Sequence, residues 1–370
     1  MAGRKLNKRQ QWRIKKIQQE RLSRAKHKQP KLAHEYSVDE KTLYHGLVVS
    51  HYGTTLEIEP DEAFPIPTLI TSSRTDANNR TLIRCSIRQN LGSIVCGDHV
   101  VWQAVVHHAP SAESPQNQPA SAPVQGVVTA VETRQSVLAR PDFNGKMKAA
   151  AANIDQILIV SSPIPEFNEG LIDRYLVAAE LSHVTPVLIL NKTDILDTEA
   201  RNILAPRVEN YKRIGYQVLY TSAKSQDGLN TLYQILEGKT SVFVGQSGVG
   251  KSSLINALLP ELNLKVAEVS DSTNKGRHTT SVSRLYHLKH KKLKDARLID
   301  SPGVREFGLW DISKEDVIHG FLDLQRYAGH CKFRDCKHLN EPGCGLLDAL
   351  DKGLISQQRL DSYHRIAESL

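Results

Sequence analysis

The chain has 370 residues, of which 40% are hydrophobic and 24% are charged, and its formal net charge is +8. This length gives room for two or three domains, each with a core of its own. No apolar run is long enough to cross a membrane, and the N-terminus is charged from Arg4 onward, without the apolar segment of a secretory signal. We therefore expect a cytoplasmic protein with no membrane partner.

The excess positive charge lies at the N-terminus. Residues 1–28 contain eleven Lys and Arg and one acid, Glu20, whereas the rest of the chain carries a net charge of −2. A basic tail on a nearly neutral body is typical of proteins that bind nucleic acid, although a solvated tail without a dedicated partner has the same composition. We expect residues 1–40 to form a disordered basic tail.

Residues 41–150 predict a small β-barrel. Short runs with strand character occupy 46–50, 54–58, 81–87, 98–106 and 126–131. Five strands in so short a segment suit a closed barrel of the oligonucleotide-binding (OB) kind, and a β-sandwich fragment with a packing role is the alternative. Residues 107–125, with four prolines and many small polar residues, predict a flexible loop between two of these strands.

Residues 151–310 predict an α/β domain. Runs with strand character occupy 156–160, 186–190, 216–220, 241–244 and 296–299, and helical patterns occupy 170–181, 229–236 and 253–259. Strands that alternate with helices predict a parallel sheet with helices on both faces. Such a sheet binds its ligands at the carboxyl ends of its strands, so the residues that follow each strand are the candidates for a site.

One of these strands leads into Gly245-Gln-Ser-Gly-Val-Gly-Lys-Ser252, which matches the phosphate-loop pattern G-x4-G-K-[ST] in its required place between a strand and a helix. The glycines allow successive backbone N–H groups to point at phosphate oxygens. Lys251 can reach the β- and γ-phosphates, and the Ser252 hydroxyl can bind Mg2+. The predicted nucleotide contacts in this loop are Gly245, Gln246, Ser247, Gly248, Val249, Gly250, Lys251, Ser252 and Ser253.

Two other strand ends carry a pattern that suits guanine. Asn191-Lys-Thr-Asp194 follows one strand and Thr221-Ser-Ala-Lys224 follows the next. The Asp194 carboxylate can accept hydrogen bonds from N1–H and the 2-amino group of guanine, and adenine offers no donors at those positions. The predicted base contacts are Asn191, Lys192, Thr193, Asp194, Ser222 and Ala223.

A fourth strand end carries Asp300-Ser-Pro-Gly303, where Asp300 can hold Mg2+ through water and the Gly303 N–H can contact a γ-phosphate. Guanine-nucleotide motifs normally begin with the phosphate loop, but here N-K-T-D and S-A-K come first, so their order is circularly permuted. With the barrel and a C-terminal cysteine cluster, this order closely resembles the RsgA family of circularly permuted GTPases. The resemblance covers nearly the whole chain from about residue 40 onward.

The resemblance implies a switch at Gly276-Arg-His-Thr-Thr-Ser281, in which Thr280 or its neighbour Thr279 binds Mg2+ and touches the γ-phosphate. Val304 stands where many GTPases carry a glutamine that orients the attacking water, so we expect slow intrinsic hydrolysis. His278 is the candidate for that role, and a packing role in the switch is its alternative. The predicted catalytic residues are His278, Lys251 and Thr280.

Residues 311–370 predict a zinc-binding and helical domain, with helices over 346–370. The spacing C-x4-C-x-H-x5-C supplies three thiolates and one imidazole, which suits one structural Zn2+ ion in tetrahedral coordination. Two reduced cysteines and a surface histidine are the alternative. The candidate ligands are Cys331, Cys336, His338 and Cys344, and the RsgA family has a zinc site at the matching positions.

The resemblance also implies a function. We expect a GTPase that binds the small (30S) ribosomal subunit and its rRNA, assists late maturation of that subunit, and hydrolyses GTP to GDP with turnover and release stimulated by the ribosome. Mg2+ with GTP and one structural Zn2+ are the implied cofactors. Nothing in the sequence points to an oligomer, so we expect a monomer. The alternatives are a nucleotide-gated RNA-binding protein that barely hydrolyses GTP and a GTPase acting on another structured RNA.

Overall fold

The computed structural model describes residues 36–38, 42–61, 74–76, 79–88, 91–107, 124–142, 144–260, 283–288, 295–300, 308–309 and 312–370. The chain divides into two compact units, Met1–Gln135 with Val282–Leu285 and Ser136–Ser281 with Tyr286–Leu370. Within the described ranges, no helix has the length and apolarity that a bilayer crossing requires.

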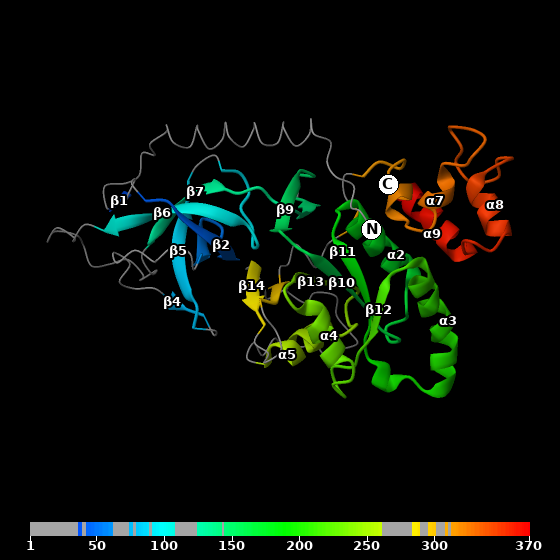
Figure 1. Cartoon of the computed structure of the whole chain (residues 1–370), viewed down its shortest axis with the longest axis horizontal. Coiled ribbons are helices and arrows are strands. Elements are labelled where there is room, and N and C mark those ends of the chain that lie inside the picture. The colour runs from blue at the N-terminus through cyan, green and yellow to red at the C-terminus, as the bar shows by residue number, and fades with distance from the viewer. Residues whose placement is uncertain are drawn as a thin grey trace. The chain divides into compact units, whose positions relative to one another are not determined.

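The first unit is a closed five-stranded barrel (Figure 1). The strands of the unit are β1 Tyr36–Val38, β2 Tyr44–His51, β3 Thr55–Pro60, β4 Arg74–Thr75, β5 Thr81–Ile87, β6 His99–His107 and β7 Gly126–Val131. The barrel consists of β2, β3, β5, β6 and β7, while β1 pairs with β6, β4 pairs with β5, and the first residues of β14 Ser283–His287 pair with β2. Hydrogen-bonded neighbours follow the order β2-β3-β5-β7-β6, and β6 pairs again with β2 to close the barrel. The five predicted strands and the predicted OB-like barrel are confirmed.

Apolar side chains fill the inside of the barrel. Trp102 is fully buried, stacks on Tyr44 with 4.9 Å between ring centroids, and donates from Nε1 to the His45 carbonyl oxygen. Along β5, Ile83 and Cys85 are buried while their neighbours in the strand are less so, as the two-residue period of a strand requires. Because side chains occupy the interior, a ligand of this unit has to bind on its outer surface.

The second unit is built on a parallel sheet (Figure 1). The strands of this unit are β8 Val137–Pro141, β9 Met147–Ala152, β10 Gln156–Ser161, β11 Thr185–Leu190, β12 Gln217–Tyr220, β13 Thr240–Val244 and β15 Arg297–Asp300, of which β8 and β9 form a separate two-stranded sheet. Its helices up to residue 260 are α2 Glu169–Leu181, η1 Thr193–Ile195, α3 Thr198–Ile214, α4 Leu229–Leu236 and α5 Lys251–Leu258. The parallel strands lie in the order β15-β13-β10-β11-β12.

The two faces of this sheet are buried against different helices. Leu158 and Val160 of β10 belong to a core that includes Leu232 of α4 and Leu254 of α5. Residues that alternate with them, such as Ile159, face the opposite side, where α2 contacts β10 and β11. The strand β13, which leads into the phosphate loop, lies between β10 and β15 although β10, β11 and β12 precede it in the chain. The predicted α/β fold with circularly permuted order is confirmed.

The C-terminal segment is helical and packs on α2. It contains η3 Val317–Gly320, α7 Gln325–Ala328, α8 Gly345–Asp351 and α9 Gln357–Glu368, so the predicted helices over 346–370 are confirmed. Gly320 meets Val177 of α2 so closely that an added Cβ would lie 2.5 Å from Val177 Cγ1. The sequence did not predict the antiparallel hairpin of β8 and β9, which belongs to the second unit. The division at residues 40, 150 and 310 stays a prediction.

Candidate nucleotide and metal sites

Four strands of the parallel sheet end at one edge, and each is followed by a predicted site segment. β13 leads into Gly245, β11 into Asn191 and β12 into Thr221, while Asp300 is the last residue of β15 and is buried. Parallel strands place their carboxyl ends on the same edge. The fold therefore brings together three segments that are separated in sequence, with Asp300 beside them.

The phosphate loop has the backbone that its glycines allow. Gly245, Gly248 and Gly250 have φ values of 140°, 81° and 93°. An added Cβ at Gly245 would lie 2.2 Å from the Val160 carbonyl oxygen, so this close approach requires glycine. Lys251 begins α5, and its Nζ donates to the carbonyl oxygens of Gly245 (2.7 Å) and Gln246 (2.6 Å). A cation and a helix N-terminus at a glycine loop form an arrangement that binds phosphate.

Asn191 connects the three segments. Its side chain is buried, and Nδ2 donates to the Val249 carbonyl oxygen of the phosphate loop (2.9 Å). Its Oδ1 accepts a hydrogen bond from the Thr221 hydroxyl (3.2 Å). The Thr193 backbone N–H and hydroxyl both donate to the Thr221 carbonyl oxygen. The predicted base-recognition loop is thus fixed to its neighbours by side-chain hydrogen bonds.

Asp194 is exposed, but one side of its carboxylate is held. The Ser222 hydroxyl, which is buried, donates to Asp194 Oδ1 (2.6 Å) and accepts from the Ser225 N–H (3.0 Å). Ala223 is half-buried and packs on the core. A carboxylate held in this orientation can accept two parallel hydrogen bonds from a ligand that approaches from the solvent side.

Lys192 contacts the loop around Ile164, a segment that the sequence analysis missed. Its φ is 61°, and its Nζ donates to the Ile164 carbonyl oxygen (2.8 Å), which also accepts from the Ser162 hydroxyl (2.8 Å). The Ile164 side chain is 65% exposed. This loop follows β10, so the strand-end rule applied to the other strands would also have selected it.

A cavity of about 590 Å3 lies beside these loops. Its lining combines apolar side chains of α3 with polar side chains of the loops, and the members are Leu190, Thr193, Asp194, Leu196, Arg201, Leu204, Ala205, Val208, Tyr220 and Asp227. Because Asp194 is part of the lining, the cavity adjoins the predicted base contact.

Several predicted residues fall outside the part of the chain that the structure describes. They are His278, Thr279, Thr280, Gly303 and Val304. Ser252 and Ser253 are described and lie half-buried in the first turn of α5. The predicted switch, the catalytic role of His278 and the choice between the two threonines stay predictions.

The four predicted metal ligands converge. One ligand atom from each of Cys331, Cys336, His338 and Cys344 lies within 4.8 Å of the others. His338 Nδ1 is 3.4 Å from the sulfurs of Cys331 and Cys344, which are 4.0 Å apart. In a tetrahedral zinc site the sulfurs are about 3.8 Å apart and each lies about 3.5 Å from the imidazole nitrogen. The donor set and its spacing therefore fit one tetrahedral metal ion.

The ionisation of this cluster also suits a cation. Burial, with smaller contributions from Cys344 and Cys331, raises the pKa of the Cys336 thiol to about 12. Burial lowers the pKa of the His338 imidazole, so its neutral form, which binds metals, is favoured. Thiolates at this site thus require a positive charge among them, and a divalent metal supplies it.

Comparisons with known proteins agree with this arrangement. A family model described as RsgA GTPase matches residues 131–310. The chain is 44% identical to the small ribosomal subunit biogenesis GTPase RsgA of Alcanivorax borkumensis, over 100% of this chain and 97% of that protein, and 43% identical to the protein of the same name in Proteus mirabilis, over 100% and 96%.

Two solved structures have the same fold. One is YjeQ from Thermotoga maritima, with a TM-score of 0.66 and 28% identity over 89% of this chain and 99% of that chain. The other is YloQ, described as a circularly permuted GTPase, with a TM-score of 0.63 and 27% identity over 91% and 97%. The named RsgA proteins match all of this chain over 96–97% of their own length, so the chain belongs to the RsgA family of circularly permuted GTPases and is a GTP hydrolase.

Proposed function

We propose that the chain binds GTP at this edge of the sheet and hydrolyses it in a cycle of binding to and release from the maturing small ribosomal subunit. The observation that carries the nucleotide site is the Asn191 amide, which joins the base-recognition loop to the phosphate loop at Val249. The names of the relatives support the ribosomal partner. The protein would act as a cytoplasmic monomer.

In the proposed site each loop has a separate task. The phosphate-loop amides from Gly245 to Ser253 and the Lys251 ammonium hold the phosphates, and Asp194 with Ser222 and Ala223 selects guanine. Mg2+ bound with the nucleotide would be held by Ser252 and Thr280 and, through water, by Asp300, and it would neutralise phosphate charge. His278 would orient the attacking water, while Lys251 stabilises the charge on the transferred phosphoryl group.

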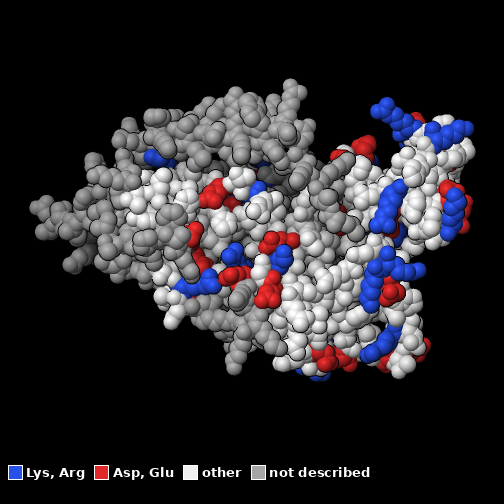
Figure 2. Space-filling model, in the orientation of Figure 1, with Lys and Arg blue, Asp and Glu red and all other residues white. Residues whose placement is uncertain are grey.

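The RNA-binding surface is proposed to include the metal segment, the barrel and the basic tail. Lys332, Arg334 and Lys337 are exposed beside the metal ligands. Phe333 is 44% exposed, and Lys332 Nζ lies 5.6 Å from its ring centroid. Figure 2 shows Lys and Arg side chains over the C-terminal segment and α3, at the right of the view, with Asp and Glu side chains among them. Exposed cations beside an aromatic ring are typical of surfaces that bind phosphates and stack on bases.

The test is steady-state GTP hydrolysis by the full-length protein, alone and with purified small ribosomal subunits. We expect slow turnover alone and a large stimulation by the subunits that Lys251→Ala abolishes. Tight GTP binding without stimulation would contradict the ribosomal role and favour another structured RNA. Tight binding without measurable turnover would favour a nucleotide-gated RNA-binding protein.

The metal is proposed to be zinc with a structural role. Residues 329–344 contain no helix or strand, so the metal is expected to hold this segment. We predict one equivalent of zinc in the purified protein, near-complete loss of it in Cys331→Ser, and rapid proteolysis of the segment in that variant. Structural zinc sites contribute about 10–16 kcal/mol, so the effect should be large.

The control for this prediction is Cys96→Ser. Cys96 is a buried barrel thiol that donates to the Val49 carbonyl oxygen, and a serine hydroxyl can make the same hydrogen bond. It should keep one equivalent of zinc. A Cys331→Ser protein with its full zinc content and an unchanged proteolytic pattern would refute the assignment.

Gly250→Ala is predicted to weaken GDP binding by about five- to tenfold, the value of roughly one hydrogen bond. The added Cβ would lie 2.3 Å from Asn191 Nδ2 and displace the amide from the Val249 carbonyl oxygen. The matched control is Gly215→Ala. Gly215 has a similar backbone conformation, with φ 114° and ψ 8° compared with φ 93° and ψ 22° for Gly250, but nothing lies within 4 Å of a Cβ added at Gly215. Both variants should lose about 1–2 kcal/mol of stability from the left-handed backbone. Equal GDP affinities, measured by titration calorimetry, would contradict the prediction.

A further inference from the structure

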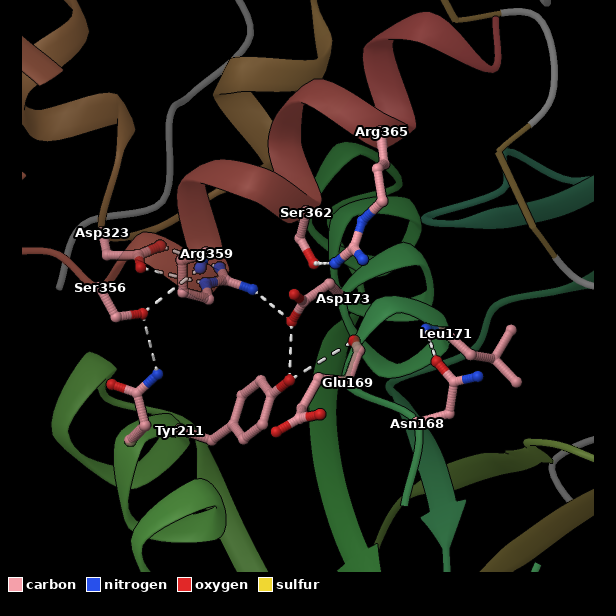
Figure 3. Close-up of polar contacts among 11 residues, drawn as sticks. Asn168, Glu169, Leu171, Asp173, Tyr211, Asp323, Ser356, Arg359, Ser362 and Arg365 are labelled. Carbon is pink, nitrogen blue, oxygen red and sulfur yellow. Dashed lines mark hydrogen bonds and ion pairs between the residues drawn. The ribbon is translucent and has the colours of Figure 1, made fainter. Parts of the chain in front are cut away.

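A buried ion-pair cluster joins the C-terminal segment to helix α2 (Figure 3). Arg359 of α9 is 0% exposed, and its guanidinium donates to both carboxylate oxygens of Asp323 (2.9 and 3.0 Å). It also donates to Oδ1 of Asp173 in α2 (2.5 Å), which is equally buried and accepts a further hydrogen bond from the Tyr211 hydroxyl (2.9 Å). Asp323 belongs to the same C-terminal segment as Arg359. Within this cluster, the Arg359–Asp173 ion pair is therefore the one that reaches α2.

On its other side, Arg359 is connected to the metal centre by packed rings. Its guanidinium carbon lies 4.4 Å from the centroid of the Phe321 ring. Phe321 packs edge-on against Tyr363 of α9 (5.9 Å), and Tyr363 lies 6.0 Å from the ring of His338, a candidate metal ligand. All three rings are at least nine-tenths buried. Interiors packed in this way transmit small displacements because they contain little free volume.

The helix α2 and the loop that leads into it also lie beside the nucleotide site. Tyr175 lies two residues beyond Asp173 and is buried. Burial raises the pKa of its hydroxyl, and the backbone of Gly245, at the start of the phosphate loop, acts on the same hydroxyl in the opposite direction. The loop that leads into α2 carries the Ile164 carbonyl oxygen, which accepts from Lys192 Nζ (2.8 Å). The loop that leads into α2 thus reaches Lys192 and, at Pro165, the phosphate loop, where an added Cβ at Gly248 would lie 3.6 Å from Pro165 Cδ. The helix itself carries Asp173 of the C-terminal cluster.

We propose that α2 couples the metal centre to the nucleotide site and that Arg359 is the positioning residue through which the coupling passes. The inference rests on the two sites proposed above. With metal bound, His338 is fixed, the packed rings of Tyr363 and Phe321 hold Arg359 in place, and Asp173 holds α2. The loop that leads into α2 then stays in place beside Lys192 and the phosphate loop. Reciprocity then requires that metal strengthens nucleotide binding and that nucleotide slows metal loss to the same thermodynamic extent.

The cluster offers a matched pair of variants. Asp173→Leu and Asp323→Leu each remove one carboxylate from Arg359 and leave the other as its partner, so each retains a neutral buried pair. Only Asp173→Leu removes the ion pair to α2, because Asp323 and Arg359 both lie in the C-terminal segment. The packing of Gly320 on Val177 is present in both variants. A general loss of stability would affect both variants, whereas a loss of coupling would affect only the first.

The experiment measures the affinity of a fluorescent GDP analogue for the full-length protein in excess Mg2+, with zinc bound and after treatment with a zinc-selective chelator. In the native protein and in Asp323→Leu, zinc removal should weaken GDP binding by about fivefold or more, the lower end of typical couplings. In Asp173→Leu the ratio of the GDP affinity with zinc bound to the GDP affinity after zinc removal should fall to about one. GDP should also slow zinc extraction in the first two proteins and not in the third.

Each of the remaining outcomes would contradict a different part of the proposal. An Asp173→Leu ratio equal to that of the native protein would overturn the role of the Arg359–Asp173 pair. A native ratio of one, with GDP and zinc both bound, would overturn the coupling and leave the proposed sites standing. A protein that binds no GDP or no zinc would overturn the proposed function itself. If Asp173→Leu does not fold, hydrogen exchange of α2 in the native protein decides, because unchanged exchange on zinc removal would refute the inference.

Discussion

Lys251→Ala is expected to lower the kcat for GTP hydrolysis by about 10²–10³-fold, the loss typical when one preorganised group that stabilises transition-state charge is removed. The ammonium is fixed at the first residue of α5 by the carbonyl oxygens of Gly245 and Gln246, so its charge lies inside the phosphate loop. Alanine leaves the loop glycines and the helix in place. GTP affinity should fall as well, because the proposed contact of the lysine with the phosphates also forms in the ground state.

The control for Lys251→Ala is Lys239→Ala. Lys239 is exposed and precedes β13, at the opposite end of the strand that leads into the phosphate loop. The variant makes the same change in charge and side-chain length away from the site, and its kcat should equal that of the native protein. Single-turnover hydrolysis with saturating GTP separates chemistry from binding. A Lys251→Ala enzyme with native single-turnover rates would remove Lys251 from the catalytic machinery.

The strand-end motifs could be predicted because their chemistry is local. Asn191, Asp194 and Lys251 each lie within a few residues of a strand whose apolar run is evident, so both the loop and its place on the sheet follow from short sequence windows. The closed barrel was predictable for the same reason, since its strands carry alternating or apolar runs. The β8–β9 hairpin was not, because the segment Met147–Ala152 consists largely of alanine and carries no strand signal.

The buried cluster around Arg359 lay beyond prediction for a different reason. Its partners are 36 and 186 residues away along the chain, and neither aspartate lies in a motif. In sequence, an Arg in the amphipathic helix α9 suggests an exposed side chain. Only the packing of α9 on α2 shows that this arginine is fully buried and paired. Candidate site residues at strand ends can thus be predicted from sequence, whereas residues that connect distant segments can be recognised only in the three-dimensional structure.

Asp194→Ala is expected to lower the affinity for GTP by roughly 10²–10⁴-fold and to leave the weak affinity for ATP nearly unchanged. Two charge-assisted hydrogen bonds of about 1.5–3 kcal/mol each account for this range. The Ser222 hydroxyl holds Asp194 Oδ1 at 2.6 Å and so orients the carboxylate toward the base. ITP, whose base keeps N1–H and lacks the 2-amino group, should bind the native protein with an intermediate affinity.

Asp227→Ala is the matched control for Asp194→Ala. Asp227 also lines the adjoining cavity, but its carboxylate accepts from the Ser225 hydroxyl (2.6 Å) and is not a predicted base contact. Its removal changes the charge of the same region by the same amount. An effect of overall charge would therefore appear in both variants and would change the binding of GTP and of ATP equally. Direct recognition of guanine predicts that discrimination between GTP and ATP falls in Asp194→Ala alone. If both variants lose GTP and ATP affinity equally, the carboxylate acts through the local field, and the base specificity must come from the backbone around Ala223.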